Sequence, residues 1–231
     1  MGGPRCFILL GLALSSGGCV LGQRPVQEPS AGDATVLVGS AALPEPIDGL
    51  ARHPWIALRD ERAQGWERWE VMCCARDTPL GTVRRTSTSP LSDYGAGGGD
   101  VRIHGVFRGQ RAEAMIECMR REAPRYPYRD VYRAWPGPNS NTFVDFMSRK
   151  CSIPVDLPAG SIGKDYRGLV IGASATAGGT GVQLETPVLG AKLGLTEGVE
   201  VHLFGMTWGV DLWPPALVLP IGPGRFGFDD R

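Results

Sequence analysis

Glycine and proline interrupt this chain so often that helix cannot dominate its fold. The 231 residues include 33 glycines and 19 prolines, which requires many turns and loops without reaching the composition of low-complexity chains. Hydrophobic residues make up 42% of the chain, which excludes a disordered polymer. The length is typical of one soluble globular domain, or of one domain with an extension.

Charge is balanced over the whole chain. The 24 lysine and arginine residues match 24 aspartate and glutamate residues, so the formal net charge is zero, and no long run of like charges occurs. A nucleic-acid-binding domain needs a basic surface that neutralises phosphates. We therefore expect no nucleic-acid partner.

The first 18 residues have the pattern of a secretory signal peptide. Arg5 supplies a short positive region, residues 6–14 (CFILLGLAL) form an apolar stretch, and residues 15–18 are a small-residue cleavage zone. As a helix the apolar stretch spans about 13 Å, against roughly 30 Å of bilayer hydrocarbon. It is too short for a permanent transmembrane helix, and we expect the mature protein on the periplasmic side of the cell envelope.

Cys19 follows the cleavage zone and resembles the lipidated cysteine of bacterial lipoproteins. In that motif the cysteine is acylated and becomes the new N-terminus. The chain departs from the motif at Ser16, where leucine is usual, and Leu14 lies two residues earlier. Two alternatives remain: a lipoprotein that meets the membrane only through Cys19, or a secreted protein after ordinary cleavage. Residues 19–46, rich in Pro, Gly, Ala and Ser, are expected to form a tether.

Four cysteines remain for the mature domain: Cys73, Cys74, Cys118 and Cys151. In an oxidising envelope they can pair, and on a strand the adjacent Cys73 and Cys74 point to opposite faces. Among the pairings we favour Cys118 with Cys151, and the others stay open. The three histidines are far apart in sequence and no C-x-x-C or H-E-x-x-H motif occurs. We expect no metal site and no cofactor.

Two helices are expected after the tether. Residues 109–122 carry apolar side chains at helical spacing and stop before Pro124, which predicts an amphipathic helix. A shorter helix should begin within residues 139–142 and bury Phe143, Phe146 and Met147.

Aromatic and β-branched runs predict short strands on both sides of these helices. The strands are expected at residues 55–58, 66–74, 101–107, 169–171, 199–204 and 216–219. A long loop rich in Ser, Thr and Gly is expected at residues 82–99.

The least ordinary stretch is YPYRDVYRAWPGPNSNTF at residues 126–143. Together with DLPAGSIGKDY at residues 156–166, it closely resembles the bacterial family of domain of unknown function 3750. The likeness runs from about His53 to the C-terminus, and both motifs are long. The resemblance itself implies no reaction.

Two shorter motifs resemble circularly permuted papain-like hydrolases, the group of lecithin retinol acyltransferase and NlpC-type proteins. NSNTFV at residues 139–144 is similar to the start of their nucleophile-bearing helix, and HPWIAL at residues 53–58 is similar to their histidine-bearing strand. This resemblance implies an α+β fold, with a permuted papain-like core at residues 47–166. The β-rich residues 167–231 would then be an extension of the same domain.

The same resemblance implies a catalytic arrangement. Ser140 stands where the group has its cysteine, His53 where it has its base, and Glu70 where some members have an acid that orients the histidine. A serine must be deprotonated during attack, so this hypothesis requires His53 within hydrogen-bonding reach of Ser140. The protein would then be a hydrolase or acyltransferase acting on an amide, peptide or ester bond of the envelope, and the backbone amide of Ser140, with that of Asn139 or Asn141, would hold the oxyanion.

Each of these residues also has a purely structural interpretation. Ser140 lies among good helix-capping residues, and a capping serine would turn its hydroxyl to the amide of residue 142 or 143. His53 precedes a proline at the start of a strand, where a surface position is common. Glu70 alternates with Trp69 and Val71, which favours a solvated face.

The aromatic residues Tyr132 and Trp135 have two interpretations as well. They could line a binding groove, or they could pack a proline-rich loop onto the core. The alternative function keeps the fold without catalysis: a non-catalytic envelope lipoprotein that binds a glycan, peptide or lipid in a degenerate cleft.

Overall fold

The computed structural model describes residues 32–47, 51–63, 65–73, 79–176, 178–212, 214–220 and 224–228. The expected signal peptide (residues 1–18) and the expected lipidation site Cys19 lie outside these residues. Among the described residues, no helix has the length and apolar character needed to cross a bilayer.

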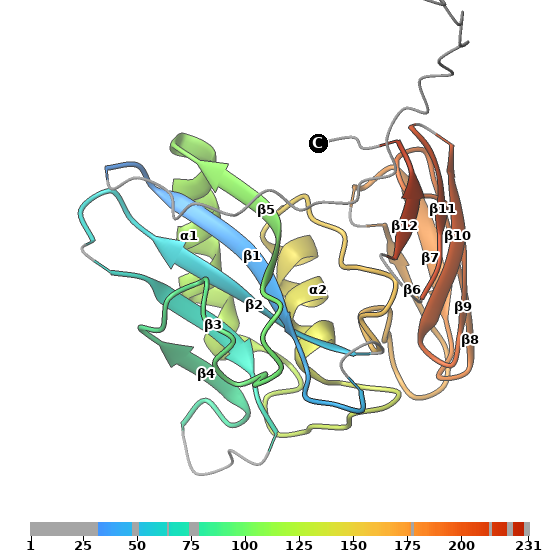
Figure 1. Ribbon diagram of the computed structural model, residues 1–231, viewed down its shortest axis with the longest axis horizontal. Helices are drawn as coiled ribbons and strands as arrows, with labels where there is room; N and C mark the ends of the chain where they lie inside the picture. The colour runs from blue at the N-terminus through green and yellow to red at the C-terminus, as the bar shows by residue number, and fades with distance from the viewer. Residues whose placement is uncertain are drawn as a thin grey trace, which may run out of the picture.

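Five antiparallel strands form sheet A, at the left of Figure 1. In spatial order they are β4 (Val83–Thr86), β3 (Glu67–Val71), β2 (Arg52–Arg59), β1 (Thr35–Ala42) and β5 (Arg102–Arg108). All eight residues of β1 are buried, because β2 and β5 flank the strand and both faces of the sheet are covered. The expected tether at residues 19–46 therefore cannot include residues 35–42, which are an inner strand of the sheet.

Two helices, α1 (Gln110–Glu122) and α2 (Ser140–Lys150), pack on one face of sheet A (Figure 1). α1 contacts β1 and β5, and α2 contacts β2 and β3. A short 3-10 turn, η1 (Ala123–Arg125), follows α1 at the proline that ends the helical pattern. Both helices form as predicted, and Phe143 and Met147 of α2 are fully buried, whereas Phe146 is only partly buried.

Sheet A carries an apolar layer on each face. On the helix side, Ile56 and Leu58 of β2 pack in one cluster with Phe143 and Met147 of α2. On the opposite side, alternate residues of the same strands form a second cluster under the loop that follows β4. Its members are Leu37, Ala41, Trp55, Ala57, Trp66 and Ala96.

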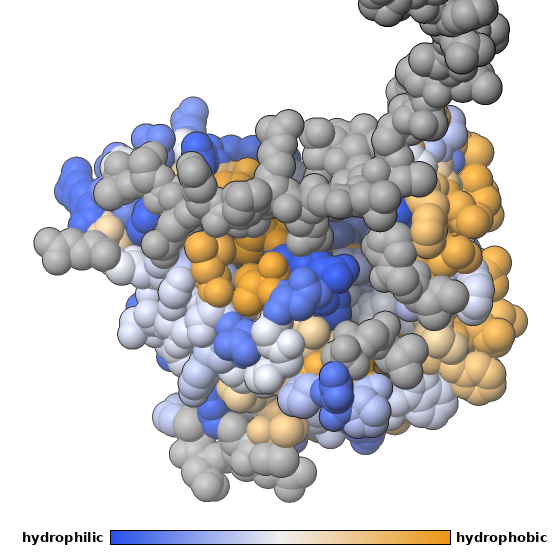
Figure 2. Space-filling model, viewed as in Figure 1, coloured by the Kyte–Doolittle hydropathy of each residue, from blue (hydrophilic) through white to orange (hydrophobic). Residues whose placement is uncertain are grey.

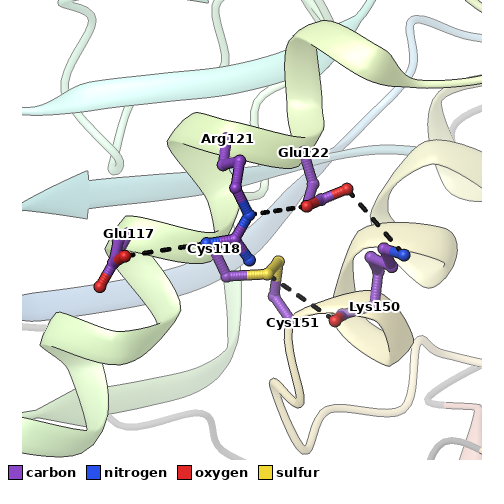
Figure 3. The surroundings of a disulfide bond; sticks show 6 residues. All are labelled: Glu117, Cys118, Arg121, Glu122, Lys150 and Cys151. Carbon is purple, nitrogen blue, oxygen red and sulfur yellow. Dashed lines mark hydrogen bonds and ion pairs between the residues drawn. A yellow bond between two sulfur atoms is a disulfide. The ribbon is translucent and has the colours of Figure 1, made fainter.

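A disulfide ties α1 to the end of α2. Figure 3 shows Cys118, on α1, bonded to Cys151, which caps the C-terminus of α2. This pairing confirms the one favoured from the sequence. Glu122 lies beside it and pairs with Arg121 at 2.8 Å and with Lys150 at 4.0 Å.

Seven antiparallel strands form sheet B, at the right of Figure 1. In spatial order they are β12 (Arg225–Gly227), β11 (Pro215–Val218), β10 (Met206–Leu212), β9 (Gly198–Leu203), β8 (Leu189–Gly194), β7 (Gly181–Glu185) and β6 (Gly172–Ala175).

Residues 151–171 connect α2 to sheet B and hold the two parts together. Arg167 Nη1 pairs with Asp145 Oδ2 of α2 at 2.9 Å, and the Thr207 amide of β10 donates to the Ala159 carbonyl at 3.4 Å. The inner face of sheet B, defined as the face toward this segment, is therefore covered.

Most strand predictions are confirmed. The patterns at residues 55–58, 66–74, 101–107, 199–204 and 216–219 correspond to β2, β3, β5, β9 and β11. The strand expected at residues 169–171 is wrong, because these exposed residues precede β6. The loop expected at residues 82–99 contains β4 at its start.

The predicted fold class, α+β with a permuted papain-like (NlpC-type) core, is wrong. In the described part of the chain, twelve strands in two antiparallel sheets dominate, and the two α-helices have only 13 and 11 residues. The Asn-Ser-Asn-Thr-Phe motif does start a helix, as expected. A helix start specifies a local conformation, however, and the sheets around it follow from strand patterns elsewhere in the chain.

Candidate functional site

The structure brings two of the three expected catalytic residues together. His53 is the second residue of β2 and Glu70 lies on β3, and these strands pair antiparallel. His53 Nε2 lies 2.8 Å from Glu70 Oε2. Both side chains are buried, and Glu70 is completely enclosed instead of lying on a solvated face.

Glu70 is also held by a buried arginine. Arg68 Nη2 donates to Glu70 Oε2 at 2.8 Å and to the Tyr94 carbonyl at 2.6 Å, and its guanidinium stacks on the Trp55 ring, with Cζ 3.8 Å from the ring centroid. Burial is the main cause that lowers the pKa of Arg68, while Glu70 acts in the opposite direction. Arg68 therefore holds the Glu70 carboxylate in place within the buried layer on the face of sheet A away from the helices.

Ser140 does not join this pair. His53 alternates in register with Trp55 and Ala57, so its side chain lies on the face of sheet A away from the helices. α2 packs on the opposite face against Ile56 and Leu58. The sheet therefore separates the hydroxyl of Ser140 from the imidazole of His53, and no hydrogen bond joins them.

Asn139, not Ser140, caps α2. Its Oδ1 accepts from the Thr142 amide at 3.1 Å, while Thr142 Oγ1 accepts from the Asn139 amide at 3.1 Å, which makes a capping box. Ser140 is the first helical residue and is buried. Among the described residues its hydroxyl forms no hydrogen bond, so it neither caps the helix nor meets a base.

Asn139 and Asn141, expected to contribute a backbone amide to an oxyanion-binding site, use their side chains inside the protein. Asn139 Nδ2 donates to the carbonyls of Ala134 and Ile162, each at 2.9 Å, and Asn141 Nδ2 donates to the same Ile162 carbonyl at 2.9 Å. These bonds fasten the loops on both sides of α2 to its first turn. Both amide groups are buried and serve the fold.

The aromatic residues of the same stretch pack loops. Trp135 Nε1 donates to the Phe204 carbonyl at 2.8 Å, and the two rings lie 6.3 Å apart. Tyr132 is half-buried against the helix-side core. Trp135 thus packs the loop before α2 against the end of β9. This contact agrees with the interpretation in which the aromatic residues pack a proline-rich loop.

A cluster of buried charges lies on the inner face of sheet B, and sequence reasoning missed it. The ionic cluster consists of Lys164, Asp165, Glu185, Lys192, Glu200 and His202. Lys164 Nζ lies 2.7 Å from Asp165 Oδ2, and Lys192 Nζ lies 2.8 Å from Glu200 Oε2. The two nitrogens of His202 contact Glu185 and Glu200.

For Glu200, Asp165 and His202, interactions within the cluster outweigh the effect of burial on the pKa. Burial alone disfavours the charged form of Glu200, but Lys164 and a hydrogen bond from His202 lower its pKa to about 2. Burial likewise opposes ionisation of Asp165, and the charges of Lys164 and His202 hold its pKa far below the ordinary range. Burial lowers the pKa of His202, and its bonds to Glu185 and Glu200 reverse this and raise it.

The ionic cluster also contains the only grouping of metal-ligating side chains among the described residues. Asp165, Glu185 and His202 offer ligand atoms within 4.8 Å of one another, beside a hollow of about 20 Å³ that has room for one water molecule. With His202 protonated, the three cations and three carboxylates of the cluster balance. Lys164 Nζ already pairs with Asp165 Oδ2, and both nitrogens of His202 contact carboxylates, so the geometry favours a closed salt-bridge network.

The outer face of sheet B has the opposite character. Exposed and buried residues alternate along each strand: β9 exposes Val199 and Val201 and buries Glu200 and His202. The apolar face, as we call it, consists of the outward residues Ala173, Ala175, Val182, Leu184, Leu189, Ala191, Leu193, Val199, Val201, Leu203, Trp208, Val210, Leu212, Leu217 and Phe226. Figure 2 shows hydrophobic residues at this edge of the molecule.

Antiparallel sheets in soluble proteins normally bury the apolar face and solvate the polar one. Sheet B does the reverse, since its buried face is charged and its exposed face contains no charged side chain. The signal was present in segments such as VQLE and VEVHL, in which apolar and polar residues alternate strictly. Alternation shows that a strand has two different faces, but not which of them the rest of the chain covers.

Residues 33–166 match the family model described as "Protein of unknown function (DUF3750)". The match confirms the family resemblance seen in the sequence, although it begins 20 residues before His53 and ends at Tyr166. Sheet B lies beyond it. No curated protein and no solved structure matches the chain.

Proposed function

The chain belongs to the DUF3750 family, and from this premise we propose that it is a non-catalytic binding protein of the cell envelope. Its binding surface is the apolar face of sheet B. The envelope location follows from the signal-peptide pattern of residues 1–18 and from Cys19. The binding role is supported by the single observation that sheet B turns its apolar side outward.

The size of this surface is the reason to assign it a partner. Seven strands at about 4.8 Å spacing and five residues at about 3.4 Å per residue give a face of roughly 30 by 17 Å, or about 500 Å² before side-chain relief is counted. An apolar patch of this extent matches the largest patch on a typical monomeric protein, and such patches often have a function. Central side chains such as Leu193, 60% exposed, lose contact with water only when something covers them.

The chemistry of the face narrows the class of partner. A glycan is recognised through hydrogen bonds to its hydroxyl groups, and the apolar face offers only aliphatic and aromatic side chains apart from the Trp208 indole N–H. A peptide or protein surface, or lipid chains, can cover it by burial of apolar area alone. The proposed function is therefore the binding of an apolar partner.

Hydroxyl-radical footprinting of the protein in isolated envelopes tests this function. Trp208 and Phe226 belong to the apolar face and are each 41% exposed in the isolated chain, while Tyr94 is 51% exposed on a loop beside sheet A. We expect strong labelling of Tyr94 and several-fold weaker labelling of Trp208 and Phe226. Equal labelling of all three aromatic residues would contradict the proposal.

A second candidate function is the hydrolase or acyltransferase with Ser140, His53 and Glu70. The observation in its favour is the 2.8 Å contact between His53 Nε2 and Glu70 Oε2, the arrangement in which an acid orients a histidine base. The observation against this function is that sheet A lies between His53 and Ser140, so catalysis would require a rearrangement of α2.

An activity-based fluorophosphonate probe separates the two functions. For a binding protein we expect no labelling of the wild type. Labelling that disappears in Ser140→Ala and His53→Ala, but persists in Ser148→Ala on the same helix, would establish the enzyme and overturn the non-catalytic proposal.

A further inference from the structure

We propose that the partner on the apolar face is a second copy of this chain, joined face to face about a two-fold axis that runs along β9. This inference rests on the proposed function and adds the identity of the partner. β9 is the central strand of sheet B, with three strands on each side. A two-fold axis parallel to β9 places β8 over the partner's β10 and β6 over the partner's β12.

The side chains of the face are complementary under this rotation. One cross-strand row contains Ala191, Val201 and Trp208 on β8, β9 and β10, because Ala191 pairs with Val201 and Val201 with Trp208. Rotation about β9 therefore places the Trp208 ring of one copy over Ala191 of the other. Val201 meets its own counterpart at the axis.

The next row shows the same relation. It runs from Ala175 on β6 through Val182, Leu193, Val199, Val210 and Leu217 to Phe226 on β12 at the far edge. The rotation sets the Phe226 ring over the small Ala175. In both rows a large aromatic side chain faces an alanine, which is what close packing of two sheets at about 10 Å requires.

The area is sufficient for a stable pair. Two faces of roughly 500 Å² each bury at least about 1,000 Å², and side-chain relief raises this toward the 1,200–2,000 Å² of standard interfaces. Such a contact is isologous, because the same surface serves both copies and the assembly closes at two.

The absence of charge on the apolar face favours a second copy of the chain over a lipid bilayer as its partner. The face has no charged residue, so self-association brings no like charges together at its centre. The apolar face also contains no lysine or arginine, and surfaces that bind anionic lipid carry clusters of these residues. A protein partner of the same apolar character fits better than a lipid surface.

The mass of the purified full chain in solution, measured by light scattering after size exclusion, tests the inference directly. We expect the wild type at twice the mass of one chain at micromolar concentration, and Val201→Lys or Val201→Glu at the mass of a single chain. Val106→Lys, a similar change at a half-exposed valine of β5 in sheet A, should stay dimeric. Circular dichroism checks that each variant is folded.

Mixing the two charged variants gives the decisive result. If Val201 faces its counterpart at the axis, Val201→Lys and Val201→Glu should form a heterodimer when combined, although neither pairs with itself. Trp208→Ala should weaken the wild-type dimer at least about 10-fold, as expected for a buried aromatic anchor.

Other outcomes overturn the inference in distinguishable ways. A monomeric wild type that sediments with phosphatidylcholine vesicles, with Trp208 protected from radicals, would replace the second copy by lipid and leave the proposed function intact. A monomeric wild type whose apolar face is labelled as strongly as Tyr94 in envelopes would overturn both proposals. A dimer that survives Val201→Lys would place the contact elsewhere and refute the inference.

Discussion

Asn139 and Ser140 are adjacent but differ in what they contribute to the fold. Asn139 caps α2 and also bonds two loop carbonyls, whereas the hydroxyl of Ser140 has no hydrogen bond among the described residues. The sequence offered four consecutive polar residues that can cap a helix, so the start of the helix was predictable. Which of them caps depends on contacts outside the helix, such as the bond from Asn139 Nδ2 to the Ala134 carbonyl, and the sequence does not show these.

We expect these two residues to respond differently to truncation. Asn139→Ala should lower the free energy of unfolding by about 1–2 kcal/mol, because it removes the cap and leaves buried groups unpaired. Ser140→Ala should change it by less than about 0.5 kcal/mol. Urea denaturation measures both, and a larger loss for Ser140→Ala would show that its hydroxyl has a partner that we have not identified.

The ionic cluster makes stability depend on pH. The folded pKa of Glu200 is about 2, below its ordinary 4.5, so its stabilisation is complete above pH 4.5 and is lost as the pH falls toward 2. The pKa of His202 is raised above 6.5, so its contribution is complete below pH 6.5 and is lost as the pH rises through the folded value. Stability should therefore be greatest between these limits.

Glu200→Gln tests the acidic limit. The variant should be less stable than the wild type at pH 6, and its free energy of unfolding should fall less steeply between pH 4.5 and 2. Glu117→Gln removes an exposed carboxylate of α1 and serves as the control, since it should keep the wild-type slope. Equal slopes for wild type and Glu200→Gln, measured by urea denaturation at each pH, would contradict the assignment.

At the scale of elements, local patterns predicted both α-helices and five of the twelve strands among the described residues. The amphipathic pattern before Pro124 gave α1, and aromatic runs gave β2 and β3. The sequence predicts a tether at β1 because its alanines, glycine and serine are weak strand formers. In the structure these residues form a strand because β2 and β5 pair with it on both sides. The sequence pattern does not predict β7 and β8, because both strands contain glycines. Gly190 is required in β8, since a Cβ at this position would lie 1.7 Å from the Glu185 carboxylate.

The disulfide is the element-scale feature with the clearest energetic consequence. It links α1 to the end of α2 across 33 residues, and a loop of that length corresponds to about 3–4 kcal/mol of stabilisation. The double variant Cys118→Ser/Cys151→Ser should lose about that amount in denaturant. Dithiothreitol should destabilise the wild type by a similar amount and leave the double variant unchanged, and an equal effect on both would point to another bond.

At the scale of the whole molecule, the two sheets depend on each other. The charges on the inner face of sheet B pair with one another and also with residues that precede the sheet: Glu200 with Lys164, Lys192 with Asp156, and His202 with Asp165. This arrangement could not be predicted from sequence. Strand patterns predict that each strand has an apolar face and a polar face. Which of the two faces is buried depends on how residues 151–171, the segment between the sheets, pack against sheet B.

We expect the full chain to unfold in one transition, because separation of the sheets would leave the ionic cluster solvated on one side and unpaired on the other. Tryptophan fluorescence reports on both sheets and far-UV circular dichroism on all secondary structure. Their transitions in urea should coincide. Two separate transitions would show that sheet B is stable without the rest of the molecule.

The outermost strands of sheet B are short, and this has a consequence for how the protein avoids aggregation. β12 has three residues and β6 has four, so the rims offer few unpaired backbone groups to which a neighbouring strand could add. Lateral growth into a filament is therefore discouraged, even though a wide hydrophobic surface is open. Hydrophobic attraction acts perpendicular to the sheet. A single contact there covers the apolar face and leaves no surface for further growth.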